Sequence, residues 1–156
     1  MLDTKGMSGK INRLELTDCP NCVCFNLRKA ARAITQLYDK ILRPTGLRTT
    51  QFSLLAATSL LEPITLTRLA EMGVIDRTTL SRNFKPLEKL GLIKVTSGED
   101  RRTRIVTLTD RGKEALAKAL PLWKKAQASV VRELGHKRWE SMQANLQGVV
   151  SIADKS

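Results

Sequence analysis

The sequence predicts a mainly α-helical protein with one small antiparallel β-hairpin, in the order four helices, a hairpin and two helices. Three observations predict this class. Apolar residues recur at spacings of three and four through most of the chain, which is the period of helices that pack by one face. Between residues 92 and 109 the spacing changes to the alternation typical of strands. Two short helical segments joined by a tight turn stand directly before that hairpin, so residues 47–109 are predicted to form a winged helix-turn-helix.

Six helices are expected, and residues typical of helix ends mark several of their boundaries. Asp76 stands as the N-cap of the fourth helix and Gly91 as its C-terminal stop. Thr65 and Thr109 are the matching N-caps of the third and fifth helices. In the fifth helix, Pro121 interrupts the apolar pattern and predicts a kink or a break, because proline removes a backbone donor. The predicted ranges are 25–42, 49–61, 65–72, 77–90, 110–134 and 136–152.

The fourth helix is predicted to present a basic and hydroxyl-bearing face to solvent. Leu80, Phe84 and Leu87 cluster on one side at about 100° per residue. The opposite side and its flanks carry groups that bond base edges and phosphates, at Thr78, Thr79, Ser81, Arg82, Lys85 and Lys89. Arg82 is the strongest candidate for a guanine contact, because a planar guanidinium can bond O6 and N7 together. The simpler interpretation is the ordinary solvated face of an amphipathic helix.

The hairpin is predicted from strands over residues 92–97 and 104–109, and the loop between them is strongly basic. Three arginines lie within four positions, at Arg101, Arg102 and Arg104. Arginines at a loop tip fit a narrow minor groove, where the negative potential of DNA is strongest. We expect Asp100 to brace one of them by pairing with its guanidinium. The alternative is a polar turn that carries charge without a partner.

The composition is that of a globular chain with a basic balance. Its 156 residues are 42% hydrophobic and 27% charged, and the formal net charge is +12. Such a charge favours a polyanionic partner, either nucleic acid or an anionic membrane surface. No apolar run reaches the roughly 18 residues that span a bilayer, and no helix combines a basic face with a wide exposed apolar one. Residues 1–17 lack the apolar stretch of a secretory signal. We therefore expect a cytoplasmic protein with no membrane partner.

The motifs of common enzymes are absent from the sequence. It contains no Gly-rich phosphate loop, no Gly-x-Ser-x-Gly and no pair of histidines for zinc catalysis, since His136 is the single histidine. We expect neither catalysis nor a cofactor.

Three cysteines, Cys19, Cys22 and Cys24, lie within six residues just ahead of the first predicted helix. A thiol near a helix N-terminus is often reactive, so oxidation could shift a dimer formed by that helix. A Cys-x-x-Cys pair also occurs in zinc sites, although three thiols are an incomplete tetrahedral set and we assign no metal. The third reading is structural, with the cysteines packed as small apolar residues.

The sequence resembles the MarR (multiple antibiotic resistance regulator) family of bacterial transcription factors over about residues 26–152. The resemblance is carried by Leu69-Ala70-Glu71, by Asp76-Arg77-Thr78-Thr79-Leu80-Ser81-Arg82, by Leu87-Glu88-Lys89-Leu90-Gly91-Leu92-Ile93, and by Asp100-Arg101-Arg102 running into Val106-Thr107-Leu108-Thr109-Asp110-Arg111-Gly112. Two positions depart from the family pattern. Arg48 stands where a threonine often caps the second helix, and Arg68 where an acidic residue is common, but Thr49 and Thr65 remain as caps.

The resemblance implies a homodimer that binds a pseudo-palindromic operator on double-stranded DNA and usually represses. It divides the chain into a tail with the cysteines (1–24), a dimerisation helix (25–46), a DNA-binding lobe (47–109) and C-terminal dimerisation helices (110–156), all in one compact unit. It implies release from DNA by a small aromatic or phenolic ligand or by cysteine oxidation. By carry-over, Thr78, Thr79, Ser81 and Arg82 match recognition-helix positions, and Arg102 matches an arginine that enters the minor groove.

A nonspecific or architectural nucleic-acid binder is the alternative function that the charge also fits. Such a protein would bind any DNA with strong salt dependence and little sequence preference. The hydroxyl groups interleaved with the basic residues of the fourth helix favour the sequence-specific interpretation.

Overall fold

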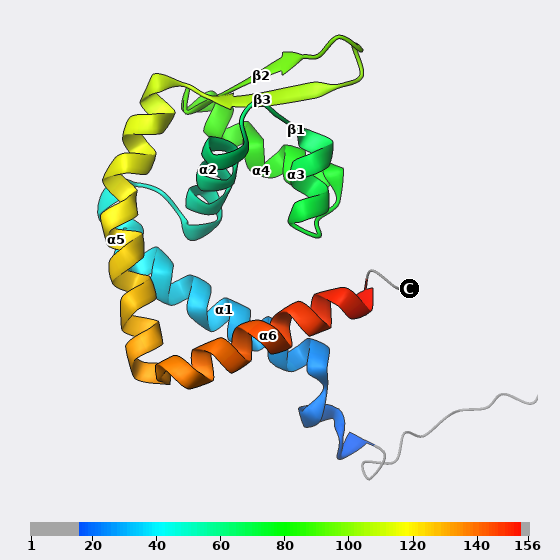
Figure 1. The fold of residues 1–156 in the computed structure, drawn as a ribbon, viewed down its shortest axis with the longest axis vertical. Helices are drawn as coiled ribbons and strands as arrows, with labels where there is room; N and C mark the ends of the chain where they lie inside the picture. Colours follow the sequence, from blue (N-terminus) through cyan, green and yellow to red (C-terminus); the bar gives the residue numbers. More distant parts are fainter. Residues whose placement is uncertain (1–15, 154–156) are drawn as a thin grey trace, which may run out of the picture. The chain divides into compact units, whose positions relative to one another are not determined.

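The computed structural model describes residues 16–153 and confirms a mainly helical chain with a small antiparallel sheet (Figure 1). Two compact units divide it, one ending at Gln36 and the other beginning at Leu37. The division falls inside the first long helix, α1 (Val23–Leu42). Residues 1–15 of the predicted tail lie outside the described part. Within residues 16–153, no helix is both long enough and apolar enough to cross a membrane.

The first unit contains a short 3-10 turn, η2 (Cys19–Asn21), and the N-terminal part of α1. Asn26 connects the turn to the helix, because its Nδ2 donates to the carbonyl oxygens of Pro20 at 2.8 Å and Cys22 at 2.9 Å. The helix begins two residues earlier than the sequence predicts, so the last of the three cysteines, Cys24, lies inside α1 and not ahead of it.

The second unit holds the helix-turn-helix, the sheet and the two C-terminal helices. After α1, its elements are η3 (Arg43–Thr45), α2 (Thr49–Leu61), β1 (Ile64–Thr65), α3 (Leu66–Met72), α4 (Arg77–Lys89), β2 (Ile93–Ser97), β3 (Arg104–Leu108), α5 (Asp110–Leu134) and α6 (His136–Ala153). The predicted boundaries of these helices agree with the observed ones to within one or two residues, because caps and apolar periodicity are local signals.

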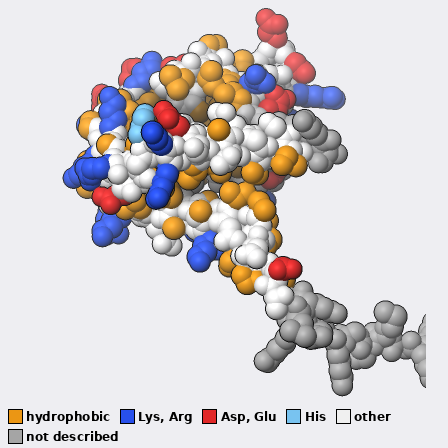
Figure 2. Space-filling view, turned by 60° about the horizontal axis from the view of Figure 1, so that its bottom comes forward, with side chains coloured by type: hydrophobic (Ala, Val, Ile, Leu, Met, Phe, Trp, Pro, Cys, Tyr) orange, Lys and Arg blue, Asp and Glu red, His pale blue; other side chains and the backbone are white. Residues whose placement is uncertain are grey.

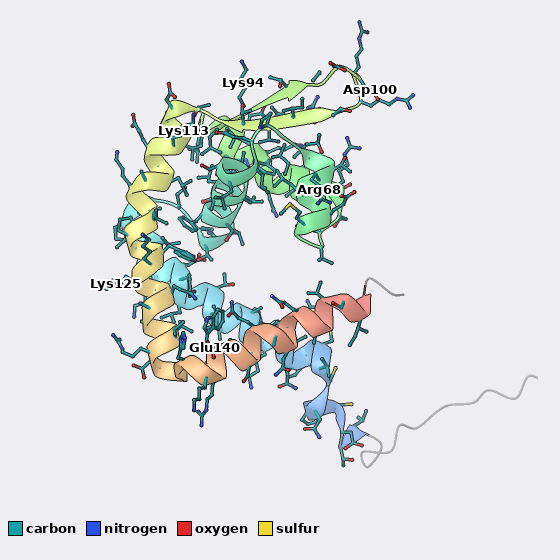
Figure 3. All side chains as sticks on the ribbon, viewed as in Figure 1. Arg68, Lys94, Asp100, Lys113, Lys125 and Glu140 are labelled. Atoms are coloured by element: carbon teal, nitrogen blue, oxygen red, sulfur yellow. The ribbon has the colours of Figure 1, made fainter. Side chains whose placement is uncertain are left out.

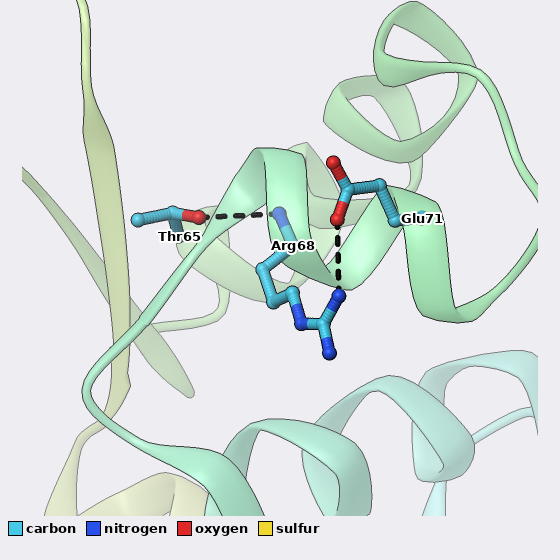
Figure 4. A network of polar contacts seen from close by, with 3 residues as sticks. All are labelled: Thr65, Arg68 and Glu71. Atoms are coloured by element: carbon cyan, nitrogen blue, oxygen red, sulfur yellow. Dashed lines mark hydrogen bonds and ion pairs between the residues drawn. The ribbon is translucent and has the colours of Figure 1, made fainter.

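The start of α3 shows how a local signal sets a boundary (Figure 4). The Thr65 Oγ1 accepts a hydrogen bond from the Arg68 backbone N–H at 3.1 Å, as predicted for an N-cap. The Arg68 guanidinium pairs with Glu71 at 3.2 Å, but both side chains are exposed, so this ion pair stabilises the helix little.

The start of α2 differs from the prediction. Arg48, not Thr49, is the N-cap, and its backbone N–H donates to Gln51 Oε1 at 2.9 Å. The Thr49 N–H donates to Asp39 Oδ1 at 2.6 Å. A carboxylate from α1 therefore accepts a backbone N–H at the start of α2, in place of a capping side chain next to it in the sequence. The Thr49 hydroxyl is buried, with no hydrogen-bond partner among the described residues.

The sheet has three strands where the sequence predicts two. β2 and β3 pair antiparallel from Ile93 opposite Leu108 to Ser97 opposite Arg104, which is the predicted hairpin. β1 adds to the other edge of β3, so the strand order is β1-β3-β2. A strand of two residues is too short for an alternating pattern, and its pairing partner lies about 40 positions away, at Ile105 and Val106.

Helix α5 runs unbroken from Asp110 to Leu134, with Pro121 inside it. Of the kink or break predicted at Pro121, the break is therefore wrong, and the kink stays a prediction. Proline leaves the carbonyl of Ala117 without its helical donor, but Ala117 is exposed, so water can bond that carbonyl.

The core of the second unit lies between α2, α4, the sheet and α5. Four of its side chains are at most 1% exposed, those of Leu55, Leu80, Leu87 and Val106. Phe52 of α2 stacks on Trp123 of α5, with ring centroids 5.7 Å apart. In contrast, no side chain of α6 from His136 to Ile152 is buried. Figure 2 shows hydrophobic side chains reaching the surface among lysines and arginines on the face in view.

Candidate nucleic-acid interface

Asp76 starts the second helix of the helix-turn-helix. Its Oδ1 accepts the Thr79 backbone N–H at 2.8 Å, and its Oδ2 accepts the Thr79 hydroxyl at 2.5 Å. These hydrogen bonds, first that of the hydroxyl and then that of the backbone N–H, lower the pKa of the Asp76 carboxyl. The carboxylate is therefore ionised at neutral pH. Because the Thr79 hydroxyl proton is committed to Asp76, that hydroxyl is available to DNA only as an acceptor.

Helix α4 buries one side and exposes the other. Leu80, Phe84 and Leu87 are at most 2% exposed. The candidate residues Thr78, Arg82 and Lys85 are exposed, and Thr79 and Ser81 are half-buried at the flanks. The exposed face is the one that helical periodicity indicates, since the apolar positions alone determine which side of an amphipathic helix packs inward.

A cleft of about 240 Å³ lies between α4 and the sheet. Its polar lining consists of Arg77, Ser81, Lys85, Glu88 and Arg104. Sequence reasoning selected Ser81, Lys85 and Arg104 but did not select Arg77 or Glu88. The spacing of Arg77, Ser81 and Glu88 places them on one helical stripe, which was the available signal.

Asp100 lies in the loop between β2 and β3 (Figure 3), and its hydrogen bonds brace the backbone of that loop. The Asp100 Oδ1 accepts the Arg102 backbone N–H at 3.0 Å, and the Asp100 carbonyl accepts the Thr103 N–H at 2.8 Å. We expected Asp100 to hold a guanidinium, but in the part of the chain that the structure describes no ion pair joins Asp100 to an arginine. Arg101, Arg102 and Arg104 have exposed side chains.

One hydrogen bond connects α4 to the tip of the hairpin. The Arg77 Nη2 donates to the backbone carbonyl of Arg102 at 3.2 Å, across 25 positions of sequence. The predicted base-reading helix and the predicted minor-groove loop are thus joined directly.

The cysteines lie at the surface. Cys19, Cys22 and Cys24 are all exposed, and no disulfide joins them. The Cys22 N–H donates to the Cys19 carbonyl at 3.0 Å, so these two residues stand at the ends of one tight turn. Within residues 16–153, no group of three or more His, Cys, Asp or Glu side chains is arranged to hold a metal ion.

A second cavity, of about 440 Å³, opens between α2, α3 and α4. Its lining is mostly apolar, with Leu54, Leu69 and Leu80 among the walls, and Thr49 and Asn83 contribute polar groups. The cavity is lined by side chains from three helices, so no pattern within a single segment of the sequence predicts it.

The comparisons with known proteins agree on one family. A family model described as "MarR family" matches residues 45–103, which run from the start of the DNA-binding lobe to the hairpin tip. The crystal structure of the M. tuberculosis transcriptional regulator MosR in complex with DNA is 40% identical, with a TM-score of 0.79, and the match covers 86% of this chain and 97% of that one.

Two curated relatives add sequence similarity. An uncharacterized HTH-type transcriptional regulator of Bacillus cereus is 35% identical over 86 residues, which is 55% of this chain and 57% of the relative. The chain therefore matches little more than half of that protein. The organic hydroperoxide resistance transcriptional regulator of Bacillus subtilis is 28% identical over 117 residues, covering 74% of this chain and 78% of the relative.

Proposed function

The chain belongs to the MarR family of transcription regulators, and from that premise we propose that it is a dimeric repressor that binds a pseudo-palindromic operator sequence-specifically. The observation that carries this proposal is the pair of exposed basic elements on one lobe, the outer face of α4 and the arginine-rich hairpin tip, joined by the bond from Arg77 to the Arg102 carbonyl. The outer face of α4 suits the major groove, and the arginine-rich hairpin tip suits the minor groove.

The residues of α4 would divide the work of recognition. The Arg82 guanidinium would read a guanine, and Lys85 and the Thr78 hydroxyl would bond phosphates or base edges. The Thr79 oxygen would accept from a base amino group, since its proton is held by Asp76. Ser81 lines the cleft beside the sheet and would contact the DNA backbone there.

Dimerisation would give two recognition helices about one helical turn of DNA apart. Support comes from α6, a helix of 18 residues in which no side chain from His136 to Ile152 is buried. Leu146, Val149 and Val150 are 40%, 36% and 44% exposed in the single chain. A second copy of this chain would cover that apolar stripe.

Release by a small aromatic or phenolic acid is supported by the cavity of about 440 Å³, a volume in the range of small-molecule sites. Thr49 and Asn83 line this cavity and would offer polar groups to such a ligand. Because Leu80 and Asn83 of α4 line the cavity, an occupant would shift the recognition helix.

Release by oxidation is supported by the exposed cysteines and by similarity to a regulator named for organic hydroperoxide resistance. Residues three apart in a tight turn have Cα atoms within about 7 Å, which suits a disulfide. The thiols of Cys19 and Cys22 would lose two electrons and two protons to a hydroperoxide, which is reduced to an alcohol and water. The disulfide so formed would alter the start of α1.

The test is binding of the reduced protein to DNA from upstream of its own gene and to scrambled DNA of equal length, across a salt series. A preference of about a hundredfold that survives near-physiological salt supports the proposal. Equal affinities that fall together with salt favour the nonspecific or architectural alternative. Addition of salicylate or of cumene hydroperoxide then identifies the release signal, with a Cys19→Ser variant as the control for oxidation and a Thr49→Val variant as the control for the ligand.

A further inference from the structure

We infer that Arg77 is a positioning residue, which holds the hairpin tip against α4 and so sets the distance between the major-groove and minor-groove contacts of each half-site. The inference rests on the proposed function for its DNA readout, but the contact itself is a property of the free protein. Arg77 is the first residue of α4, and its Nη2 reaches the Arg102 carbonyl at 3.2 Å.

The Arg102 residue is held on both sides of its backbone. Its N–H is bonded by the Asp100 carboxylate at 3.0 Å and its carbonyl by the Arg77 guanidinium. The Arg102 side chain remains exposed. The backbone from which this side chain projects is thus oriented relative to α4, while the guanidinium is left available for a ligand.

The tip needs such an anchor because the sheet supports only its base. β1 pairs with β3 at Ile105 and Val106, and β2 pairs with β3 as far as Arg104. Beyond that point the loop 98–103 has no strand pairing, and its own backbone hydrogen bonds are those from Gly98 to Thr103 and from Thr103 to Asp100. Among residues 16–153, only the hydrogen bond from Arg77 to Arg102 links this loop to a helix, and no ion pair does so.

The position of Arg77 on α4 separates it from the exposed recognition face. Arg77 shares the flank of Ser81 and Glu88, which lines the cleft toward the sheet. At about 100° per residue, Thr78 and Arg82 lie roughly 100° and 140° further around the helix, and neither of them lines the cleft. An arginine that contacted a phosphate directly would act independently of the hairpin, whereas a positioning residue acts through Arg102. This difference is measurable.

The first experiment needs no DNA. Backbone ¹⁵N relaxation of residues 98–103 is compared between the wild type, Arg77→Ala, and Arg68→Ala as a control that removes another exposed arginine from the same lobe. We expect order parameters of the tip to fall from values near 0.8 to below about 0.6 in Arg77→Ala alone. A tip that is equally ordered in all three proteins overturns the inference, whatever the protein does with DNA.

The second experiment is a double-mutant cycle on operator DNA with Arg77→Ala, Arg102→Ala and the double variant. We expect each single change to weaken binding about tenfold and the double variant to bind no more weakly than Arg102→Ala. Independent losses that multiply, with a salt slope that falls by about 0.9 for each arginine, mean that Arg77 is a phosphate contact and overturn the inference. An Arg77→Lys variant, which keeps the charge without the planar fork, should restore binding only partly. A wild type without operator preference refutes the proposed function but leaves the first experiment decisive for Arg77.

Discussion

Replacing Gly112 by alanine should destabilise the fold, because the first turn of α5 lies against the backbone at the start of β2. A Cβ at this position would stand 1.9 Å from the carbonyl oxygen of Leu92 and 2.9 Å from its carbonyl carbon. The same Leu92 oxygen accepts the Thr109 N–H at 3.1 Å, and Thr109 Oγ1 accepts the Gly112 N–H at 3.0 Å. The glycine therefore permits the close approach on which the hydrogen bond from Thr109 to Leu92 depends, whereas the bond from Gly112 to Thr109 is local to the start of α5.

The expected cost follows from these contacts. The neighbour is backbone, so α5 and Leu92 must separate by more than an ångström to admit a methyl group. Overpacking of this kind costs about 1–3 kcal/mol, and a strained or lost hydrogen bond from Thr109 adds about 1 kcal/mol. We expect the free energy of unfolding to fall by about 2–4 kcal/mol and the midpoint of thermal unfolding by about 5–15 °C.

The assay is urea unfolding at one fixed protein concentration, with Gly148→Ala as the matched control. Gly148 is also a helical glycine, but a Cβ there meets nothing within 4 Å, so alanine should raise stability by about 0.5–1 kcal/mol. The two substitutions are thus expected to move the unfolding midpoint in opposite directions. Equal shifts would refute the close approach of α5 to Leu92.

Four further predictions concern the DNA-binding lobe. Val74 has a φ of 49° and is 61% exposed, so Val74→Gly should stabilise the protein by about 0.5–1 kcal/mol in urea unfolding, and a loss would contradict backbone strain. The Asp76 pKa is lowered by the Thr79 hydroxyl and N–H, so the stabilising effect of the Asp76 carboxylate is present above the unfolded carboxyl pKa and lost as the pH falls through the folded pKa. The difference in free energy of unfolding between the wild type and Asp76→Asn should therefore close in acid. A difference that stays constant with pH would refute the linkage. Arg82→Ala should weaken operator binding by about 1–3 kcal/mol and relax the preference at one base pair per half-site, whereas equal losses on operator and random DNA would exclude base reading. Thr49→Val should leave stability unchanged or raise it by up to about 1 kcal/mol, since it removes a buried hydroxyl without a partner, and a large loss would reveal a partner for that oxygen.

Elements with local signals were predictable from the sequence. Asp76 and Thr65 accept the backbone N–H groups three residues ahead of them, as their positions before apolar runs indicated. The exposed face of α4 followed from three apolar positions alone. The arginine-rich loop between two alternating segments likewise indicated both the hairpin and its charge.

Features that depend on distant partners were not predictable. The cap of α2 involves Asp39, ten positions before the N–H that it accepts. The third strand exists because β3 offers an unpaired edge to Ile64 and Thr65. Pro121 predicts a kink or a break, yet α5 is not broken there, because the carbonyl of Ala117 that loses its donor is in an exposed residue.

The sequence by itself determined the helices, the hairpin and the residue types that a DNA-binding surface requires, because periodicity, capping and charge act over a few positions. Only the tertiary structure decided which groups are fixed. It turned the Asp100 carboxylate to the Arg102 N–H and brought Arg77 to the Arg102 carbonyl. It also assembled a cavity from α2, α3 and α4 and buried the Thr49 hydroxyl without a partner among the described residues. These features arise where segments far apart in the chain pack together, and the geometry of such contacts is set by the whole core and not by any local pattern.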